Sequence, residues 1–160
     1  MAKIERKYMA HFINTAKSDA EAAYVRLGKD LEEYSPEMSA EVNTTKNILG
    51  ETSVSVTGYE KSASVEPYYA EKGDPLFTRL QDIIDNASTL DDCNTDVVEV
   101  KLWEDAEEGA YPAIQEKAVI EVTSYGGDAT GYQIPFTLHY TGEKVKGTFN
   151  VATKTFTPAN

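Results

Sequence analysis

Residues 118–140 read AVIEVTSYGGDATGYQIPFTLHY, and this stretch decides the fold class of the chain. Apolar residues take every second position on both sides of a glycine-rich loop, at Ala118, Ile120 and Val122 before it and at Ile134, Phe136, Leu138 and Tyr140 after it. Successive side chains of a strand point to opposite faces, so a period of two predicts strands with one buried and one polar face.

The same alternation recurs from residue 41 to residue 157. We expect further strands at Tyr24–Leu27, Leu31–Tyr34, Met38–Lys46, Thr52–Gly58, Ser62–Glu66, Val98–Leu102, Val145–Val151 and Thr155–Thr157. Gly28–Asp30, Gly50, Thr141–Glu143 and Thr153–Lys154 are predicted turns. Antiparallel strands joined by short turns indicate a sandwich or barrel.

One amphipathic helix interrupts the strands, at Pro75–Ala87. Asp74 is placed to accept backbone N–H groups at the helix start, and proline at the first position loses no hydrogen bond. The apolar residues of this segment fall on one face at helical spacing, at Leu76, Phe77, Leu80, Ile83, Ile84 and Ala87.

With 160 residues, the chain is long enough for one domain with a sizeable core. We predict a mainly β (α+β) fold, an antiparallel β-sandwich or barrel of two sheets flanked by the helix. Residues 24–160 form this core, and residues 1–23 form a flexible N-terminal arm that ends in a small, polar connector at Thr15–Ala23. Tyr59–Gly73 is expected to be a long loop around a short strand at Ser62–Glu66, and Pro67, Tyr68 and Tyr69 favour an ordered loop because aromatic residues give it something to pack.

Acidic residues outnumber basic ones by 27 to 15, and the formal net charge is −12. A nucleic-acid binder usually presents a basic face to the phosphates, so tight binding of DNA or RNA is not expected. Cys93 is the only cysteine, which argues against a disulfide framework or a thiolate zinc site. The chain shows neither a signal-peptide core nor a run of about 20 apolar residues, so we expect folding in a cytoplasm and no membrane partner.

No pattern in the sequence points to catalysis, to a metal or to a cofactor. Asp92–Asp96 begins like a calcium loop, but Val97 and Trp103 stand where that loop needs glycine and glutamate. Glu104–Gly109 is an acidic cluster that should be solvated. His11 and His139 lie far apart in the sequence, and neither pairs with a nucleophile in a recognised order.

Several stretches resemble the major tail tube proteins of long-tailed bacteriophages and prophages of Gram-positive bacteria. The resemblance begins at Tyr24–Glu33 (YVRLGKDLEE) and covers the rest of the chain. It continues at Lys46–Glu51, Val65–Tyr69, Gly73–Phe77, Ser124–Gly127 and Lys146–Phe149. None of these stretches is a mechanistic motif, and the likeness lies in their order along the chain.

The resemblance implies a structural virion protein that is made in the host bacterial cytoplasm. It implies hexameric rings that stack into a tail tube, with DNA passing through the lumen without specific binding. The implied partners are further copies of the chain and the tape-measure, tail-terminator and distal tail proteins. Terminal arms and long loops supply the contacts between rings in such proteins, and here these are Met1–Asn14 and Tyr59–Gly73.

The aromatic residues of these two segments are the candidate subunit-interface residues, namely Tyr8, Phe12, Tyr59, Tyr68 and Tyr69. Two alternatives stay open: the tube of a contractile, phage-tail-like particle, and a small carbohydrate-binding β-sandwich that uses Trp103 and the tyrosines. An enzyme ranks last because the sequence shows no catalytic constellation.

Overall fold

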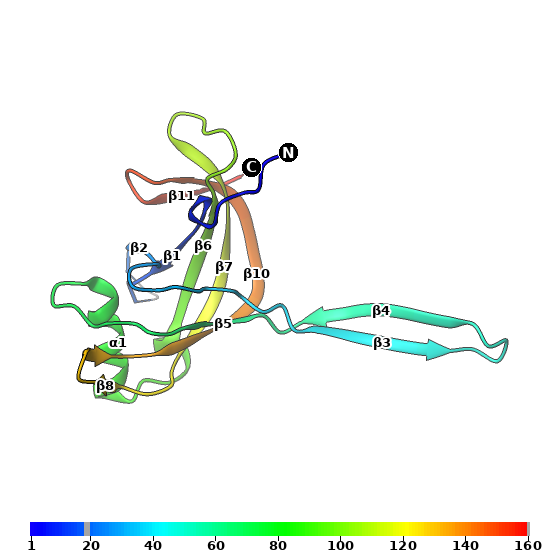
Figure 1. The fold of residues 1–160 in the computed structure, drawn as a ribbon, viewed down its shortest axis with the longest axis horizontal. Coiled ribbons are helices and arrows are strands. Elements are labelled where there is room, and N and C mark those ends of the chain that lie inside the picture. The colour runs from blue at the N-terminus through cyan, green and yellow to red at the C-terminus, as the bar shows by residue number, and fades with distance from the viewer. Residues whose placement is uncertain (18–19, 160) are drawn as a thin grey trace.

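The computed structural model describes residues 1–17 and 20–159 (Figure 1). Its helices are the α-helix α1 (Pro75–Asn86) and the short 3-10 helices η1 (Arg6–Tyr8) and η2 (Leu90–Cys93). The strands are β1 (Met9–Asn14), β2 (Tyr24–Arg26), β3 (Ala40–Lys46), β4 (Thr52–Tyr59), β5 (Ser62–Val65), β6 (Asn94–Lys101), β7 (Ala110–Val122), β8 (Gly126–Asp128), β9 (Gly131–Gln133), β10 (Phe136–Asn150) and β11 (Thr155–Pro158).

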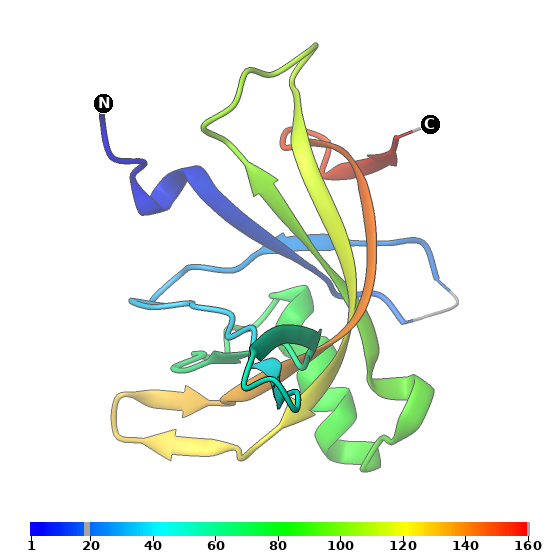
Figure 2. The same cartoon turned by 90° about the vertical axis from the view of Figure 1, so that its right-hand side faces the viewer.

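The body of the protein is one curled antiparallel sheet. Its strands follow the order β11-β10-β7-β6-β1-β2, and β5 pairs with the first part of β10. The curl is visible in the contact between Phe12 of β1 and Phe149 of β10, whose ring centroids lie 4.6 Å apart although two strands separate them in the sheet. The predicted mainly β, sandwich-or-barrel architecture with one α-helix is therefore confirmed, in the form of a single sheet that folds over on itself (Figure 2).

Two apolar clusters hold the body together. One lies between the sheet and α1, where Leu76, Leu80 and Ile83 pack against the sheet. The other lies inside the curl and contains Phe12, Tyr24, Val98, Val100 and Phe149. Val97 and Val98 are neighbours in β6, but Val97 packs in the first cluster and Val98 in the second. Their side chains point to opposite faces of the sheet.

The ends of α1 follow the sequence prediction. The Asp74 side chain accepts a hydrogen bond from the Leu76 N–H at 3.0 Å, and Pro75 is the first helical residue. The helix ends at Ala87, which is left-handed with φ 46°. The buried Arg79 ties the helix to its surroundings by donating hydrogen bonds to the carbonyl oxygens of Ala16, Asp92 and Asn94.

The hairpin turn predicted at Thr141–Glu143 is wrong. Strand β10 continues through these residues and pairs with β7 on both sides of a register shift between Tyr140 and Lys144. Gly142 adopts φ 89°, a conformation open to glycine, and lets the strand bulge without reversing. The turn at Thr153–Lys154 does form, and it leads into β11.

The predicted N-terminal arm is also wrong for Met9–Asn14. These residues form β1, which lies between β2 and β6, and Phe12 is only 2 % exposed. The strand predicted at Leu31–Tyr34 is absent, and this segment is irregular. In the predicted connector Thr15–Ala23, Thr15 hydrogen-bonds to the Ala23 carbonyl oxygen; Ser18 and Asp19 lie outside the described residues.

The segment Tyr59–Gly73 belongs largely to the body. Residues 62–65 of it form β5, and Tyr68 packs edge-on against Phe136 of β10, with ring centroids 6.0 Å apart. The part of the chain that stands away from the body is instead the pair of strands that precedes it, β3 and β4 (Figure 1).

Because β1 lies inside the sheet, we predict that truncation of one of its buried side chains destabilises the protein. Phe12→Ala should lower the free energy of unfolding by about 3–5 kcal/mol, because it removes a buried ring from the cluster inside the curl. The matched variant Tyr8→Ala, on a side chain that is 40 % exposed, should cost less than about 1 kcal/mol. Urea unfolding followed by circular dichroism measures both, and equal costs would contradict the placement of β1 in the core.

Candidate interaction surface

The most exposed feature of the molecule is the hairpin, which we define as β3, the turn Asn47–Glu51 and β4. It projects from the body as a two-stranded ribbon (Figure 1). Every residue of β3 is exposed, and so is every residue of β4 except Gly58. The side chains on both faces of the ribbon are thus open to solvent, whereas the alternation in Thr52–Gly58 predicted one buried face.

The tip of the hairpin has a defined turn. The Asn47 side-chain oxygen accepts hydrogen bonds from the N–H groups of Leu49, at 2.9 Å, and Glu51, at 3.0 Å. Gly50 supplies the positive φ, 81°, that the turn requires. The turn presents Ile48 and Leu49 to solvent, and both side chains are strongly exposed.

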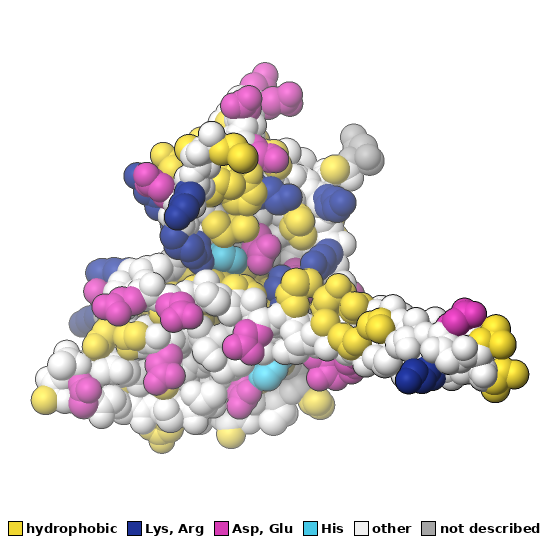
Figure 3. Space-filling model, turned by 45° about the vertical axis from the view of Figure 1, so that its right-hand side comes forward, with side chains coloured by type: hydrophobic (Ala, Val, Ile, Leu, Met, Phe, Trp, Pro, Cys, Tyr) yellow, Lys and Arg dark blue, Asp and Glu magenta, His cyan; other side chains and the backbone are white. Residues whose placement is uncertain are grey.

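The two faces of the hairpin differ in chemistry. Val42 lies opposite Val56, and Val54 lies opposite Thr44, so the three valines share one face. The other face carries the polar pairs Asn43–Ser55 and Thr45–Ser53. The valines are 53–66 % exposed, and hydrophobic side chains gather on the part of the hairpin near the body and again at its tip (Figure 3).

An isolated two-stranded hairpin is at best marginally stable in water, and it gains stability when one face packs against something else. Exposed apolar side chains gathered near the root of the hairpin and at its tip are typical of an interaction site (Figure 3). The apolar face of the hairpin, together with Ile48 and Leu49, is therefore the candidate interaction surface of the protein.

A buried ionic cluster lies where the hairpin joins the body. Lys61, which follows the hairpin, places its ammonium 2.9 Å from a Glu116 carboxylate oxygen and 3.3 Å from one of Glu99. His11 contacts the same Glu99 oxygen at 3.4 Å. Lys61 also accepts a hydrogen bond from the Tyr140 N–H, so the base of the hairpin is bonded to β10 next to the bulge.

Contacts within the cluster shift the pKa values of Glu99 and Lys61. The hydrogen bond from His11 and the charge of Lys61 lower the pKa of Glu99 to about 2, against the opposing effect of burial. Burial alone would lower the pKa of Lys61, but its contacts with Glu116 and Glu99 outweigh burial and raise it. Removal of one partner from a buried ion pair leaves the other charge uncompensated, so the loss of Lys61 should destabilise the protein at the point where the hairpin joins the body.

The five predicted interface residues do not form one surface. Phe12 lies in the core, and Tyr68 is buried with its hydroxyl donating to Asp74 at 2.5 Å. Tyr69 is half-buried and lies beside Thr130, Tyr8 is on η1, and Tyr59 ends β4. Only Tyr59 belongs to the hairpin. The residues that sequence reasoning missed are the valines, whose alternation was assigned to a strand with one face in the core.

The residues that the sequence analysis considered for metal binding or catalysis do not come together in one site. Asp92 and Cys93 lie on η2, and Asp96 accepts hydrogen bonds from Asn14 and Tyr24, so the calcium-like stretch forms no loop around an ion. His139 pairs with Glu121 at 2.6 Å on the exposed face of β10. Within residues 1–17 and 20–159, the structure brings together no group of three or more side chains that could ligate a metal.

The chain matches no protein-family model and no curated protein sequence. Among the described residues, no helix has the length and apolar character needed to cross a bilayer.

The ionic cluster predicts a pH dependence. Because the pKa of Glu99 falls from 4.5 to about 2 on folding, its contribution to stability is present above pH 4.5 and is lost as the pH falls toward 2. Glu99→Gln should remove this part of the slope of unfolding free energy against pH, whatever it does to the overall stability.

Urea titrations at several pH values between 2 and 6 measure that slope. The control Glu51→Gln, on an exposed carboxylate that forms no ion pair with another described residue, should keep the wild-type slope. A Glu99→Gln protein with the wild-type slope would show that Glu99 is not the group responsible.

Proposed function

We propose that this chain is a structural subunit that assembles with copies of itself into stacked hexameric rings, forming the tail tube of a long-tailed phage. DNA would pass through the lumen, and the tape-measure, tail-terminator and distal tail proteins would contact the tube in the virion. The observation that carries the proposal is the hairpin, whose apolar face stays exposed because no described residue of the body packs over it.

Three further observations support this proposal. The order of short sequence stretches resembles that of major tail tube proteins. The resemblance implies a β-barrel or sandwich of two sheets flanked by one helix, and the mainly β body with one α-helix agrees with that fold. The net charge of −12 suits a conduit for DNA, because an acidic lumen would repel the phosphates that pass through it.

Self-assembly also gives a role to the edges of the sheet. Its outer strands, β2 at one edge and β11 and β5 at the other, are three or four residues long. Short edge strands limit uncontrolled pairing, and a ring in which each sheet continues into the next would leave no edge free. The contact between neighbours in a ring joins two different surfaces of the chain, and it closes only when the rotation between copies is right.

The carbohydrate-binding alternative finds less support. Tyr132 packs edge-on against Phe77 of α1, and the Tyr69 hydroxyl lies 3.4 Å from that of Thr130. These two rings are engaged within the chain, which leaves them less free to stack on a sugar. In the other alternative, the chain forms the tube of a contractile, phage-tail-like particle. That particle differs from a non-contractile tail in the sheath that surrounds the tube.

The hairpin offers a matched test of assembly. Val54→Lys with Val56→Lys places two charges on the apolar face, whereas Ser53→Lys with Ser55→Lys places two charges on the opposite face of the same strand. Wild-type protein at high concentration should form rings or tubes in negative-stain electron microscopy and sediment as large species. The valine variant should remain monomeric, because a buried, unpaired charge opposes the contact.

The serine variant is the control for charge and for strand propensity, and it should assemble like the wild type. A wild-type protein that stays monomeric at every concentration would contradict the proposal. Assembly of the valine variant at the wild-type concentration would show that the apolar face of the hairpin is not the contact.

A further inference from the structure

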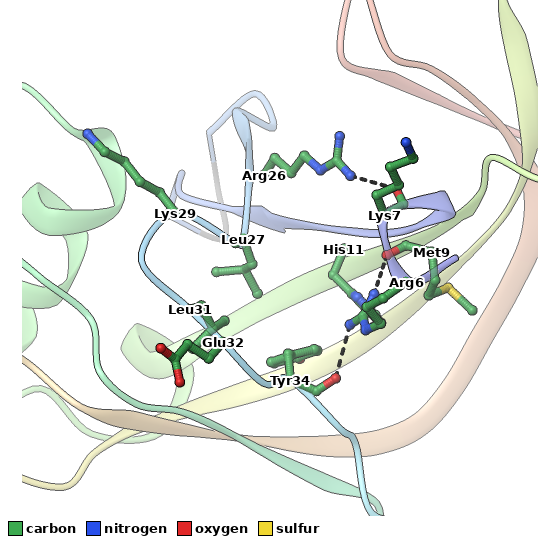
Figure 4. A pocket seen from close by; sticks show the side chains of 11 residues that line it. Arg6, Lys7, Met9, His11, Arg26, Leu27, Lys29, Leu31, Glu32 and Tyr34 are labelled. Carbon is green, nitrogen blue, oxygen red and sulfur yellow. Dashed lines mark hydrogen bonds between the residues drawn. The ribbon is translucent and has the colours of Figure 1, made fainter. Parts of the chain in front are cut away.

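A basic pocket lies beside the N-terminal strands of this acidic protein. It is a cavity of about 610 Å³ between η1, β2 and the segment that follows β2 (Figure 4). Its rim carries Arg6, Lys7, Arg26 and Lys29, and Glu32 is the one acidic residue among those that line it. The buried His11 and Tyr34 and the half-buried Leu27 and Leu31 also contribute to its wall.

The two arginines are held in place without being neutralised. Arg6 donates hydrogen bonds to the carbonyl oxygens of Met9, at 2.5 Å, and Tyr34, at 3.0 Å. Arg26 donates to the Lys7 carbonyl oxygen at 3.0 Å. Within the described part of the chain, no carboxylate lies within 4 Å of either guanidinium, whereas Lys7 pairs with Glu5 and Lys29 pairs with Glu71. The pocket thus keeps two fixed, uncompensated positive charges.

A second surface, the acidic loop, carries negative charge that complements the positive charge of the basic pocket. We define this loop as Glu104–Gly109. It joins β6 to β7, projects beyond the body (Figure 2), and carries the exposed carboxylates of Glu104, Asp105, Glu107 and Glu108. None of these four forms an ion pair with another described residue, as judged over residues 1–17 and 20–159. Trp103, directly before the loop, is 38 % exposed.

The acidic loop is already shaped before it meets a partner. Reciprocal hydrogen bonds of 2.9 Å join the backbones of Glu107 and Ala110. Glu108 and Gly109 between them both have positive φ, 51° and 82°, which is the geometry of a tight two-residue hairpin turn. A preformed turn loses little conformational entropy on binding.

We propose that the basic pocket receives the acidic loop of a neighbouring copy of the chain, an inference that rests on the proposed self-assembly. A guanidinium offers paired N–H donors that match the two oxygens of a carboxylate, so Arg6 and Arg26 can each take one acidic side chain of the loop. The exposed Trp103 ring adds a face on which an arginine can stack.

This contact gives the assembly a direction. The pocket and the loop are different surfaces of one chain, so in the proposed ring each copy offers its loop to one neighbour and its pocket to the other. The contact is electrostatic and lies near solvent, so assembly that depends on it should weaken as ionic strength rises.

Charge reversal tests the contact, with assembly followed by sedimentation and electron microscopy on the full chain. The pocket variant carries Arg6→Glu and Arg26→Glu, and the loop variant carries Glu104→Arg and Glu107→Arg. Each alone should raise the protein concentration needed for assembly by about tenfold or more, because like charges then face each other across the contact. A chain that carries all four substitutions should assemble at close to the wild-type concentration, because the pair is restored with its signs exchanged.

The control for overall charge is Lys72→Glu with Lys154→Glu, on two exposed lysines, which changes the net charge as the pocket variant does. It should assemble at the wild-type concentration. Because Arg6 also anchors the backbone, Arg26→Glu alone provides a milder pocket variant, and thermal unfolding checks that each protein is folded.

The outcomes separate this inference from the proposed function. A wild-type chain that does not assemble contradicts both the proposed function and the pocket contact. A wild-type chain that assembles, with pocket and loop variants that assemble at the same concentration, overturns the pocket contact alone. The pocket contact is also overturned if the pocket variant and the loop variant both lose assembly and the chain with all four substitutions does not assemble at close to the wild-type concentration.

Discussion

The structure depends on one constraint: the apolar face of a β-sheet must be covered. In the body this requirement is met within the chain. The sheet curls until Phe12 meets Phe149 on one face, and α1 covers part of the other face. The hairpin has the same alternation of apolar and polar residues, but Val42, Val54 and Val56 stay exposed, uncovered by any residue in 1–17 or 20–159. An incomplete surface on an otherwise complete domain is the physical basis for proposing self-assembly.

The junction between body and hairpin is built from charges. Lys61 is held between Glu99 and Glu116, its ammonium lies 4.5 Å from the Tyr140 ring centroid, and the Tyr34 and Tyr140 hydroxyls are 2.8 Å apart. Apolar residues could fill such a site with equal or greater stability, but directed hydrogen bonds fix one arrangement of the strands.

Much of the fold was predictable where local signals act alone. Asp74 and Pro75 mark the start of α1, and the alternation around Val98 and Ile120 marks strands that the sheet does bury. Predictions failed where distant contacts decide the outcome. Thr141–Glu143 has the composition of a turn, yet β7 pairs on both sides of it and keeps β10 continuous through a bulge. Met9–Asn14 could be an arm or a strand, and only its partners β2 and β6 make it a strand.

The candidate surface was harder to predict than the fold. Alternation reports that one face of a strand is apolar, but it does not report whether that face is covered by its own chain or by another. The exposed valines therefore gave the same signal as core residues, and tyrosines such as Tyr68 were favoured for the interface although the core uses them. Arg6 and Arg26 lie 20 positions apart in the sequence, and only the pairing of β1 with β2 brings their charges to one pocket.

The most direct test of the central claim is thiol labelling of a single cysteine on each face of the hairpin, at Val54→Cys and Ser53→Cys, in dilute and in assembled protein. The native Cys93 is buried and provides the background. Covering of the apolar face by a neighbouring copy predicts that assembly slows labelling at position 54 much more than at position 53. Equal labelling rates for Val54→Cys in the dilute and assembled states would contradict the account.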